Sequence, residues 1–420
     1  MRPIKPITEL RATIHVPGSK SYTQRALIAA ALARGQSLLR GPLFSEDTAH
    51  LITALNSLGA HIHAQGPDLT VAGTGGNLTI PPGPIYMGNN GTGLRLLTGV
   101  VSLGHGTFLL DGNDRMRQRP IQPLVDALQK LGVQASCRKK DGCPPVEVLA
   151  DGIGGGKTTL AGGLSSQYLS SLLLAAPYAG GDVAIEVLGV LPSRPYIDMT
   201  LDVMERFGAE VSLLDDGAFL VRAPQAYRSN EYAVEGDASS ATYFMAAAAI
   251  CGGTVGIENV SPDSVQGDLR FIDILKTMGC RVGRSGKGLE IRGPLTCHDD
   301  LSFDLHDVPD MVPALAVVSA FRKGKTDLKN IGHLRIKESD RIAALTRELR
   351  KIGAMVEEKE DAMVIQGLAT RGGDIECYHD HRIAMSFAIA GLAIEGVVIK
   401  DPDCVKKSFP DFWDKLASLG

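Results

Sequence analysis

Basic side chains stand at the starts of predicted helices in this sequence, which is an unusual position for them. Lys20 and Arg25 open a long Ala/Leu run in "PGSKSYTQRALIAAALARG". The first turn of a helix carries partial positive charge and favours acidic side chains, so a lysine there opposes the helix dipole. Ser19 and Ser21 read as helix caps, but the two cations predict an anionic ligand at the helix start.

Further cations share this location, although the net charge of the chain is -4. They are Arg95, Arg115, Arg117, Arg119, Arg194, Lys337, Arg341, Arg382, Lys406 and Lys407. Arginine recognises carboxylate and phosphate groups with two parallel hydrogen bonds, and lysine offers a compact charge. A solvated surface explains any one of these residues better than a site does. Their repetition at helix junctions favours a site for polyanions.

Three acidic residues, Asp310, Glu338 and Asp380, occupy the same junctions. Asp310 and Asp380 are equally well explained as helix caps. Glu338 lies beside Lys337 in a predicted loop, where no cap is needed. Carboxylates and lysines crowded into one site shift one another's pKa and act as proton donors and acceptors. The three residues are therefore candidates for acid–base chemistry.

A repeat of amphipathic helices positions these residues. Six segments carry apolar residues at helical spacing and end in glycine, at Gly59, Gly132, Gly208, Gly279, Gly353 and Gly420. A terminal glycine predicts a helix that closes in the left-handed conformation, and a short alternating strand follows the first five. One face of each helix is polar, so these helices are expected to cover a core.

Six almost wholly apolar segments stand about 40 residues upstream of those glycines. They begin with small or polar residues at Ser19, Asn89, Ser165, Asp237, Asp310 and Asp380. A helix that is apolar on every side must be buried. Because single cores stop growing near ~250 to 300 residues, the 420 residues predict two similar α/β domains of three units each. Inner helices that point the same way bring their starts together, where an anion is expected.

Composition excludes several other classes of protein. The chain has no long Lys/Arg run, so we expect no nucleic acid and no anionic membrane as a partner. No stretch approaches the ~18 apolar residues of a membrane span, and the N-terminus lacks a signal-peptide core. The 7 cysteines are scattered and include no CxxC pair, which is typical of a reducing compartment. We therefore expect a cytoplasmic protein.

Three other motifs are disfavoured as sites. "DGIGGGKTTL" fails as a phosphate loop because Asp151 stands where that pattern needs glycine. "HIH" at 61–63 fits the solvent face of a strand, and "HDH" at 379–381 opens a helix that Asp380 caps. We expect neither a metal nor a cofactor.

The assembled motifs resemble the 5-enolpyruvylshikimate-3-phosphate synthase family of enolpyruvyl transferases over essentially the whole chain. The resemblance rests on "PGSKSYTQRA", "GNNGTGLRLL", "DRMRQRPI", "SSQYLSSLLLA", "SRPYIDMTL", "GDASSATYF", "VPDMVPALA", "RIKESDRI", "DHRIAMSFA" and "DPDCVKKSFP". It implies two inside-out α/β domains of three repeated units, with buried parallel inner helices and an active site in the cleft between the domains. Residues 19–233 would form the shikimate-3-phosphate side, and residues 1–18 plus 234–420 the phosphoenolpyruvate side.

The resemblance also implies a reaction and its residues. The enolpyruvyl group of phosphoenolpyruvate moves to the 5-hydroxyl of shikimate 3-phosphate, and phosphate leaves a tetrahedral intermediate, on the pathway to chorismate and the aromatic amino acids. The implied shikimate 3-phosphate ligands are Ser21, Arg25, Ser165, Ser166, Gln167, Ser193, Tyr196, Asp310 and Lys337. The implied phosphoenolpyruvate ligands are Lys20, Gly91, Arg119, Arg341, Arg382 and Lys407. Lys20 and Glu338 would move protons at the phosphoenolpyruvate end, and Asp310 would be the base toward the hydroxyl.

Two alternatives remain open at this point. One is the related enolpyruvyl transferase that acts on UDP-N-acetylglucosamine, which usually has Lys-Asn where this chain has Lys20-Ser21. The other is a non-catalytic anion-binding protein, which the joint presence of Lys20, Asp310 and Glu338 disfavours. The chain departs from the usual family pattern at Asn90 and Leu96, behind the implied phosphoenolpyruvate pocket. We expect a monomer that acts on small molecules.

Overall fold

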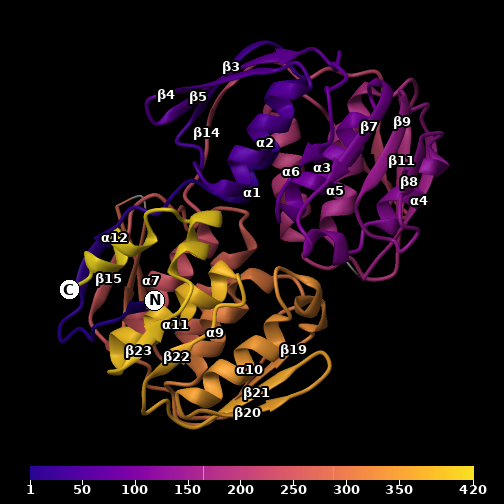
Figure 1. Cartoon of the computed structure of the whole chain (residues 1–420). Helices are drawn as coiled ribbons and strands as arrows, with labels where there is room; N and C mark the ends of the chain where they lie inside the picture. The colour runs from indigo at the N-terminus through magenta and orange to yellow at the C-terminus, as the bar shows by residue number, and fades with distance from the viewer. Residues whose placement is uncertain (164, 287) are drawn as a thin grey trace. The chain divides into compact units, whose positions relative to one another are not determined.

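The computed structural model describes residues 1–163, 165–286 and 288–420. The chain forms two compact units, a first unit of Gly18–Val234 and a second unit of Met1–Pro17 with Glu235–Gly420. Each unit has a hydrophobic core of its own. Figure 1 shows the first unit in indigo to magenta and the body of the second unit in salmon to yellow.

The first unit contains three inner and three outer helices. The inner helices are α1 (Lys20–Leu32), α3 (Gly91–Val101) and α5 (Ser166–Ala175). The outer helices are α2 (Glu46–Ser57), α4 (Gln122–Lys130) and α6 (Pro195–Arg206). The inner helices contact one another and are buried almost all round, as their apolar sequences require. The outer helices bury one face only.

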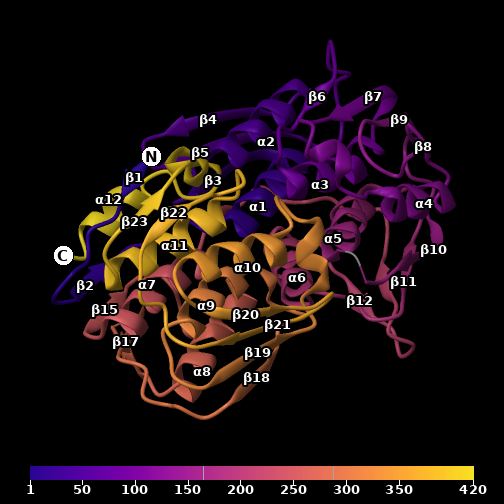
Figure 2. The ribbon, with the colours of Figure 1, turned by 60° about the horizontal axis from the view of Figure 1, so that its bottom comes forward.

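The second unit repeats this arrangement. Its inner helices are α7 (Ala238–Cys251), α9 (Val312–Ser319) and α11 (His381–Ala393). Its outer helices are α8 (Arg270–Thr277), α10 (Arg341–Lys351) and α12 (Phe412–Ala417). Figure 2 shows α10 beside α9 and α11, and these helices are in contact. The prediction of six inner and outer helix pairs in an α/β protein is confirmed.

Three mixed sheets cover the first unit. In order they are β14-β3-β5-β4, β6-β7-β9-β8 and β10-β11-β13-β12. In each sheet the first two strands pair in parallel and the other pairs are antiparallel. The strands are β3 (Arg34–Arg40), β4 (His61–Gln65), β5 (Asp68–Thr74), β6 (Ile85–Tyr86), β7 (His105–Asp111), β8 (Gln134–Cys137), β9 (Val146–Asp151), β10 (Gly156–Ala161), β11 (Val183–Leu188), β12 (Ser212–Leu213), β13 (Phe219–Val221) and β14 (Glu231–Ala233).

The second unit also has three sheets, of which two repeat that pattern. They are β2-β15-β17-β16, β18-β19-β21-β20 and the three-stranded β22-β23-β1. In the last sheet β1 pairs antiparallel with β23. It takes the place that two antiparallel strands occupy in the other sheets. The strands are β1 (Arg2–Pro3), β2 (Arg11–Ile14), β15 (Thr254–Ile257), β16 (Arg281–Ser285), β17 (Gly288–Arg292), β18 (Leu301–Asp304), β19 (Lys325–Lys329), β20 (Met355–Glu358), β21 (Met363–Gln366), β22 (Gly373–Ile375) and β23 (Val397–Ile399).

Two strands exchange partners between the repeats. β2 precedes α1 in the chain but pairs in parallel with β15, which follows α7. β14 precedes α7 but pairs in parallel with β3, which follows α1. This exchange is why residues before Gly18 belong to the second unit.

Glycines close the first five outer helices as predicted, but Gly420 does not close α12, which ends at Ala417 with Ser418 as its cap. Gly59 and Gly353, for example, follow α2 and α10 with φ of 102° each, a conformation that favours glycine. Two of the predicted starts of inner helices need correction. The residue that caps α3 is Asn90 rather than Asn89, and a 3-10 turn, η4 (Pro309–Met311), precedes α9.

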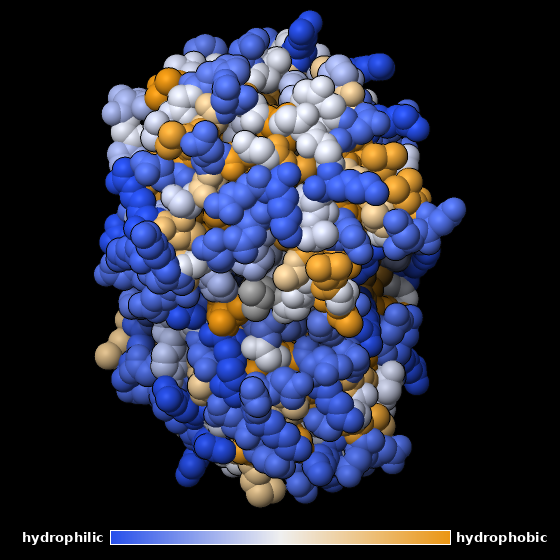
Figure 3. All heavy atoms as spheres, turned by 90° about the vertical axis from the view of Figure 1, so that its right-hand side faces the viewer, coloured by the Kyte–Doolittle hydropathy of each residue, from blue (hydrophilic) through white to orange (hydrophobic). Residues whose placement is uncertain are grey.

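The surface carries no large apolar expanse on the face shown in Figure 3, where hydrophilic residues (blue) surround small hydrophobic patches (orange). Among the described residues, no helix is both long and apolar enough to cross a membrane.

The remaining short 3-10 helices are η1 (Met116–Gln118), η2 (Ala176–Tyr178), η3 (Gly267–Leu269), η5 (Gly332–Ile336) and η6 (Pro402–Lys407).

Candidate active site

The start of α1 holds Lys20 as its first helical residue. Ser19 is the cap and accepts a hydrogen bond from the Tyr22 amide, whereas Ser21 lies inside the helix. The Lys20 ammonium is 3.5 Å from the carboxylate of Asp47, in the first turn of α2. Asn90 donates to the Asp47 carbonyl at 2.7 Å and caps α3, so the starts of α1 and α3 lie close together.

Arg119 lies over the first residue of α3. Its guanidinium donates to the carbonyl and side-chain oxygens of Asn89, at 3.2 and 3.1 Å. A Cβ atom on Gly91 would stand 2.6 Å from the Arg119 guanidinium carbon. Only a residue without a side chain therefore lets this buried cation approach the helix start so closely.

Arg25 is a buried cation bound by neutral groups. It donates to the hydroxyls of Thr200 and Ser170 and to the carbonyls of Ser21 and Tyr196. Burial lowers the pKa of Arg25 to about 10, although neighbouring tyrosines oppose the shift. Among the described residues no carboxylate lies within ion-pair distance of it. The positive charge is thus available to an anion, and the side chain fixes the backbone of Ser21 and Tyr196.

The start of α5 meets the start of α3. Ser165 caps α5, and Ser166 is its first residue. Gln167 accepts a hydrogen bond from Arg95 at 2.6 Å and donates to Thr92 at 2.9 Å. Gln167 and Thr92 are each the second residue of their helix, so the two helices begin at the same end of the unit.

Ser193 and Tyr196 lie at the start of the outer helix α6. Ser193 is buried and has a φ of 61°, in the left-handed region that a serine rarely adopts. Tyr196 is the second residue of α6. Strained backbone of this kind is concentrated at ligand sites, which makes Ser193 a stronger candidate than its residue type suggests.

Arg341 is the centre of a buried ionic cluster in the second unit. It is the first residue of α10 and is 1% exposed. Its guanidinium contacts three carboxylates, those of Asp380 at 2.8 Å, Glu338 at 2.9 Å and Asp310 at 3.2 Å. Burial alone would lower the pKa of Arg341, but these carboxylates together raise it above its ordinary value.

Arg382 shares Asp310 with Arg341. The second residue of α11, Arg382, donates to Asp310 at 2.7 Å and to the Tyr243 hydroxyl at 3.4 Å. Asp380 caps α11 by accepting from the Arg382 amide at 3.0 Å, so the capping interpretation of Asp380 is confirmed. The capping interpretation of Asp310 is wrong, because Met311 occupies the cap position of α9 without a side-chain cap. Asp310 instead bridges the two arginines.

Lys337 and Lys407 flank this cluster in the sequence. Lys337 directly follows η5 and precedes Glu338, in a half-buried loop. Lys407 is the last residue of η6, is 6% exposed, and belongs to a turn that packs against α11. Both lysines therefore belong to segments next to the helices that carry Arg341 and Arg382.

Several other cations flagged in the sequence have ordinary carboxylate partners. Arg117 pairs with Asp111 at 2.7 Å, Arg194 with Asp198 at 3.0 Å, and Lys406 with Asp403 at 2.6 Å. Such pairs are typical of solvated helix junctions.

The disfavoured motifs also have structural roles. The lysine and threonines of "GGGKTTL" lie in strand β10. His61 and His63 are exposed on β4, on either side of buried Ile62. In the described part of the chain, no group of three or more His, Cys, Asp or Glu side chains is arranged to hold a metal ion.

Sequence reasoning missed Asp47, Tyr243 and Ser339. Asp47 looks like an ordinary acid in the first turn of a helix, and Tyr243 lies within an apolar helix. Ser339 donates to Asp380 at 2.9 Å from the loop that carries Glu338. Only their distant partners reveal their role, and the sequence carries no signal of those contacts.

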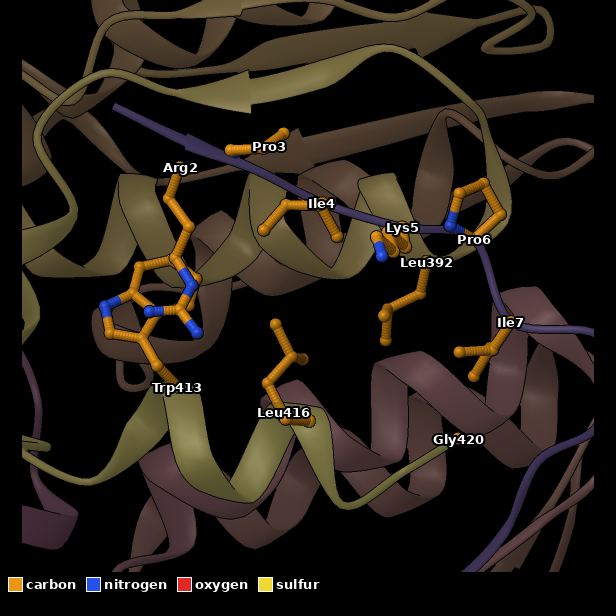
Figure 4. A pocket seen from close by; sticks show the side chains of 11 residues that line it. Arg2, Pro3, Ile4, Lys5, Pro6, Ile7, Leu392, Trp413, Leu416 and Gly420 are labelled. Atoms are coloured by element: carbon orange, nitrogen blue, oxygen red, sulfur yellow. The ribbon is translucent and has the colours of Figure 1, made fainter.

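A separate pocket of about 420 Å³ lies between the N-terminal strand and α12 in the second unit (Figure 4). Ile4, Leu392 and Leu416 line it, and the Arg2 guanidinium stacks 4.7 Å from the Trp413 ring. Among the described residues that line this pocket, none is a predicted site residue.

The fold and the site together define a class of protein. Each unit brings the starts of inner helices together and supplies them with buried cations, and the second unit adds three carboxylates. These features are those of a two-unit α/β protein whose buried cations suit polyanions and whose carboxylates suit proton transfer.

Comparison with known proteins gives the family. The family model "EPSP synthase (3-phosphoshikimate 1-carboxyvinyltransferase)" matches residues 4–416. A 3-phosphoshikimate 1-carboxyvinyltransferase from Syntrophobacter fumaroxidans is 43% identical, covering 99% of each chain. One from Methanothermobacter thermautotrophicus is 44% identical, over 98% of this chain and 96% of the relative. A solved EPSP synthase from Acinetobacter baumannii is 29% identical, with a TM-score of 0.83 over 100% of this chain and 98% of that chain.

The chain belongs to the EPSP synthase family. It is a transferase, and its activity is enolpyruvyl transfer in the shikimate pathway, which leads to chorismate and the aromatic amino acids. The predicted family, fold class and activity are confirmed.

Proposed function

We propose that the buried cluster of Asp310, Glu338, Arg341 and Arg382 is where this enzyme joins phosphoenolpyruvate to the 5-hydroxyl of shikimate 3-phosphate. One observation carries the proposal: two buried arginines share the Asp310 carboxylate, and Glu338 contacts one of them. Cations hold the anionic substrate there, while the adjacent carboxylates exchange protons with it.

Shikimate 3-phosphate is assigned mainly to the first unit. The proposed ligands are Ser21, Arg25, Ser165, Ser166, Gln167, Ser193 and Tyr196, with Asp310 and Lys337 from the second unit. Arg25 supports this assignment because it is buried and its hydrogen-bond partners within the described part of the chain are neutral groups. The hydroxyls and amides at the start of α5 suit a phosphate, since a helix start offers unpaired N–H groups.

Phosphoenolpyruvate is assigned to Lys20, Gly91, Arg119, Arg341, Arg382 and Lys407. In the proposed reaction C3 of phosphoenolpyruvate gains a proton as the 5-hydroxyl oxygen bonds to C2, and the hydroxyl loses its proton to Asp310. The tetrahedral intermediate then loses a proton from C3, the C–O bond to phosphate breaks, and the enol ether forms. Lys20 and Glu338 are the proposed proton carriers at C3 and the phosphate.

Both proposed substrates are small soluble anions, and the net charge of -4 offers no attraction to nucleic acid. We propose that the enzyme works as a cytoplasmic monomer without a cofactor. Light scattering after gel filtration is expected to give the mass of one chain, 44.5 kDa. A stable dimer would contradict the monomer.

A phosphate-release assay tests the proposed function. Purified enzyme with phosphoenolpyruvate and shikimate 3-phosphate is expected to release inorganic phosphate, and mass spectrometry should find the enol ether product. UDP-N-acetylglucosamine in place of shikimate 3-phosphate is the matched control and should give no phosphate. Release only with the nucleotide sugar would support the rival activity, and no release with either would reject the proposal.

Gly91→Ala should weaken phosphoenolpyruvate binding. The new Cβ atom would meet the Arg119 guanidinium at 2.6 to 2.7 Å, so the cation must move away from the start of α3. Misplacement of a charged group by about 1 Å costs up to about a hundredfold, so we expect KM for phosphoenolpyruvate to rise about tenfold or more. Steady-state kinetics with saturating shikimate 3-phosphate measure the change.

Gly83→Ala is the control for this substitution, because a Cβ atom there meets nothing within 4 Å. It should leave KM and kcat at wild-type values. An unchanged KM in Gly91→Ala would mean that Arg119 does not act on phosphoenolpyruvate through this contact.

A further inference from the structure

Asp268 is a buried carboxyl that the proposed reaction does not use. It lies in η3 and is 5% exposed. One carboxyl oxygen accepts a hydrogen bond from the Ser239 hydroxyl, and the other has no hydrogen-bond partner among the described residues. A buried polar atom without a partner destabilises a fold, so its presence needs an explanation.

The segment that carries Asp268 is fixed to the start of α7. The Gln266 side chain accepts from the Ala238 amide at 3.0 Å and donates to the Gly236 carbonyl at 2.8 Å. Gln266 and Asp268 therefore both hydrogen-bond to the first turn of α7. These hydrogen bonds fix the position of Asp268 relative to α7.

Helix α7 places Asp268 on the same side as the arginine cluster. Ser239 and Tyr243 are four residues apart on α7 and so share one face of the helix. Ser239 bonds to Asp268, and Tyr243 bonds to Arg382, which in turn contacts Asp310 at 2.7 Å. The Arg382 guanidinium thus contacts Asp310 directly and acts electrostatically on Asp268.

Three charged groups act on Asp268 from the surrounding elements. They are Asp310 of η4, Arg382 of α11 and Asp237 at the start of α7. Arg270 and Asp273 of the following helix α8 are exposed. Burial raises the pKa of Asp268 to about 7, Asp310 adds to the rise, and Arg382 opposes it. The group is therefore poised to change charge near neutral pH.

We infer that Asp268 is a positioning residue that acts on Arg382: when it is neutral it leaves the guanidinium to Asp310 and a bound anion, and when it is ionised it competes with that anion. The inference rests on the proposed function, which assigns Arg382 to phosphoenolpyruvate. Ionisation of Asp268 lowers the positive potential at Arg382, so phosphoenolpyruvate binds more weakly as the pH rises through 7.

The test compares wild type with Asp268→Asn, which keeps the acceptor for Ser239 and removes the charge. KM for phosphoenolpyruvate is measured from about pH 6 to 8.5, and the ratio of the two KM values cancels the ionisation of the substrate itself. The KM of wild type divided by the KM of the variant should be near one at the acid end of this range and rise to about ten at the alkaline end. The value of kcat and the KM for shikimate 3-phosphate should change little.

Asp263→Asn is the matched control, because Asp263 lies in the same segment with its side chain exposed and paired to Arg284. Its KM ratio should not vary with pH. A flat ratio in Asp268→Asn, or an equal loss in both kinetic constants at every pH, would overturn the inference. A wild-type enzyme without phosphate release would instead reject the proposed function.

Thermal unfolding gives a readout that does not depend on activity. A carboxyl whose pKa is higher in the folded state than in the unfolded state destabilises the fold increasingly as the pH rises. This loss develops between the pKa of the unfolded chain and the folded pKa of about 7. The variant lacks this loss, so its Tm relative to wild type should increase from about pH 5 to 8. A constant Tm difference would show that Asp268 does not titrate in this range, and the inference would fail.

Should Asp268→Asn not fold, wild-type enzyme still tests the inference. Calorimetric titration of phosphoenolpyruvate into enzyme without shikimate 3-phosphate, so that no turnover occurs, in buffers of different ionisation enthalpy near pH 7.5, reports protons exchanged on binding. Proton uptake is expected, because a bound anion favours neutral Asp268. Proton release or no exchange would contradict it.

Discussion

Lys20→Met is expected to abolish turnover and leave the protein folded. General acid–base catalysis contributes about a hundredfold to ten thousandfold, and the proposed function also assigns the ammonium to an anionic substrate, so we expect kcat/KM to fall about a thousandfold or more. The fold should survive because Ser19, and not Lys20, caps α1. The substitution leaves the buried Asp47 carboxylate without this cation, but Asp47 lies in the first turn of α2, where the helix dipole stabilises a carboxylate. Removing a cation from the start of α1 also relieves an unfavourable interaction with the dipole of that helix.

Phosphate release at saturating substrate and a thermal melt of the same sample check both parts of this prediction. Lys5→Met makes the same change at an exposed lysine and should match wild type in each measurement. Lys20→Arg keeps the positive charge but replaces the compact ammonium that carries the proton. Its KM for phosphoenolpyruvate should therefore be closer to the wild-type value than its kcat is. Turnover by Lys20→Met within about tenfold of wild type would remove Lys20 from the chemistry.

Local periodicity explains why so much of the fold was predictable. The alternation of apolar and amphipathic helices depends on spacing within one segment, and the closing glycines at Gly59, Gly132 and Gly353 adopt positive φ because a helix end requires it. These features need no knowledge of distant partners. The anomaly of Lys20 at a helix start was equally local, and the structure places it there.

Long-range pairing was beyond the same reasoning. β2 and β14 are short strands of 4 and 3 residues that pair with strands far away in the sequence, and local periodicity carries no information on such partners. Asp310 carries the pattern of a helix cap, and only the approach of Arg341 and Arg382 from other helices gives it a different role. Asp268 shows no sequence signal at all, because its burial depends on the packing of η3 against α7.

Arg341→Met should have the largest effect on stability. The buried guanidinium contacts Asp380, Glu338 and Asp310, whose side chains are at most 21% exposed. Removing one partner of a buried ionic group leaves the others uncompensated and typically costs about 3 to 5 kcal/mol. We expect a loss of this size in the free energy of unfolding of the second unit, together with loss of phosphate release.

The chain suits this measurement because it has 1 tryptophan, and Trp413 belongs to the second unit. Urea unfolding followed by its fluorescence therefore reports on the unit that contains Arg341, and circular dichroism follows both units. Arg281→Met places the same side chain on an exposed strand position of that unit and should shift the midpoint little. If Arg341→Met unfolds within about 1 kcal/mol of wild type, the three carboxylates do not depend on this cation, and Arg341 serves substrate alone.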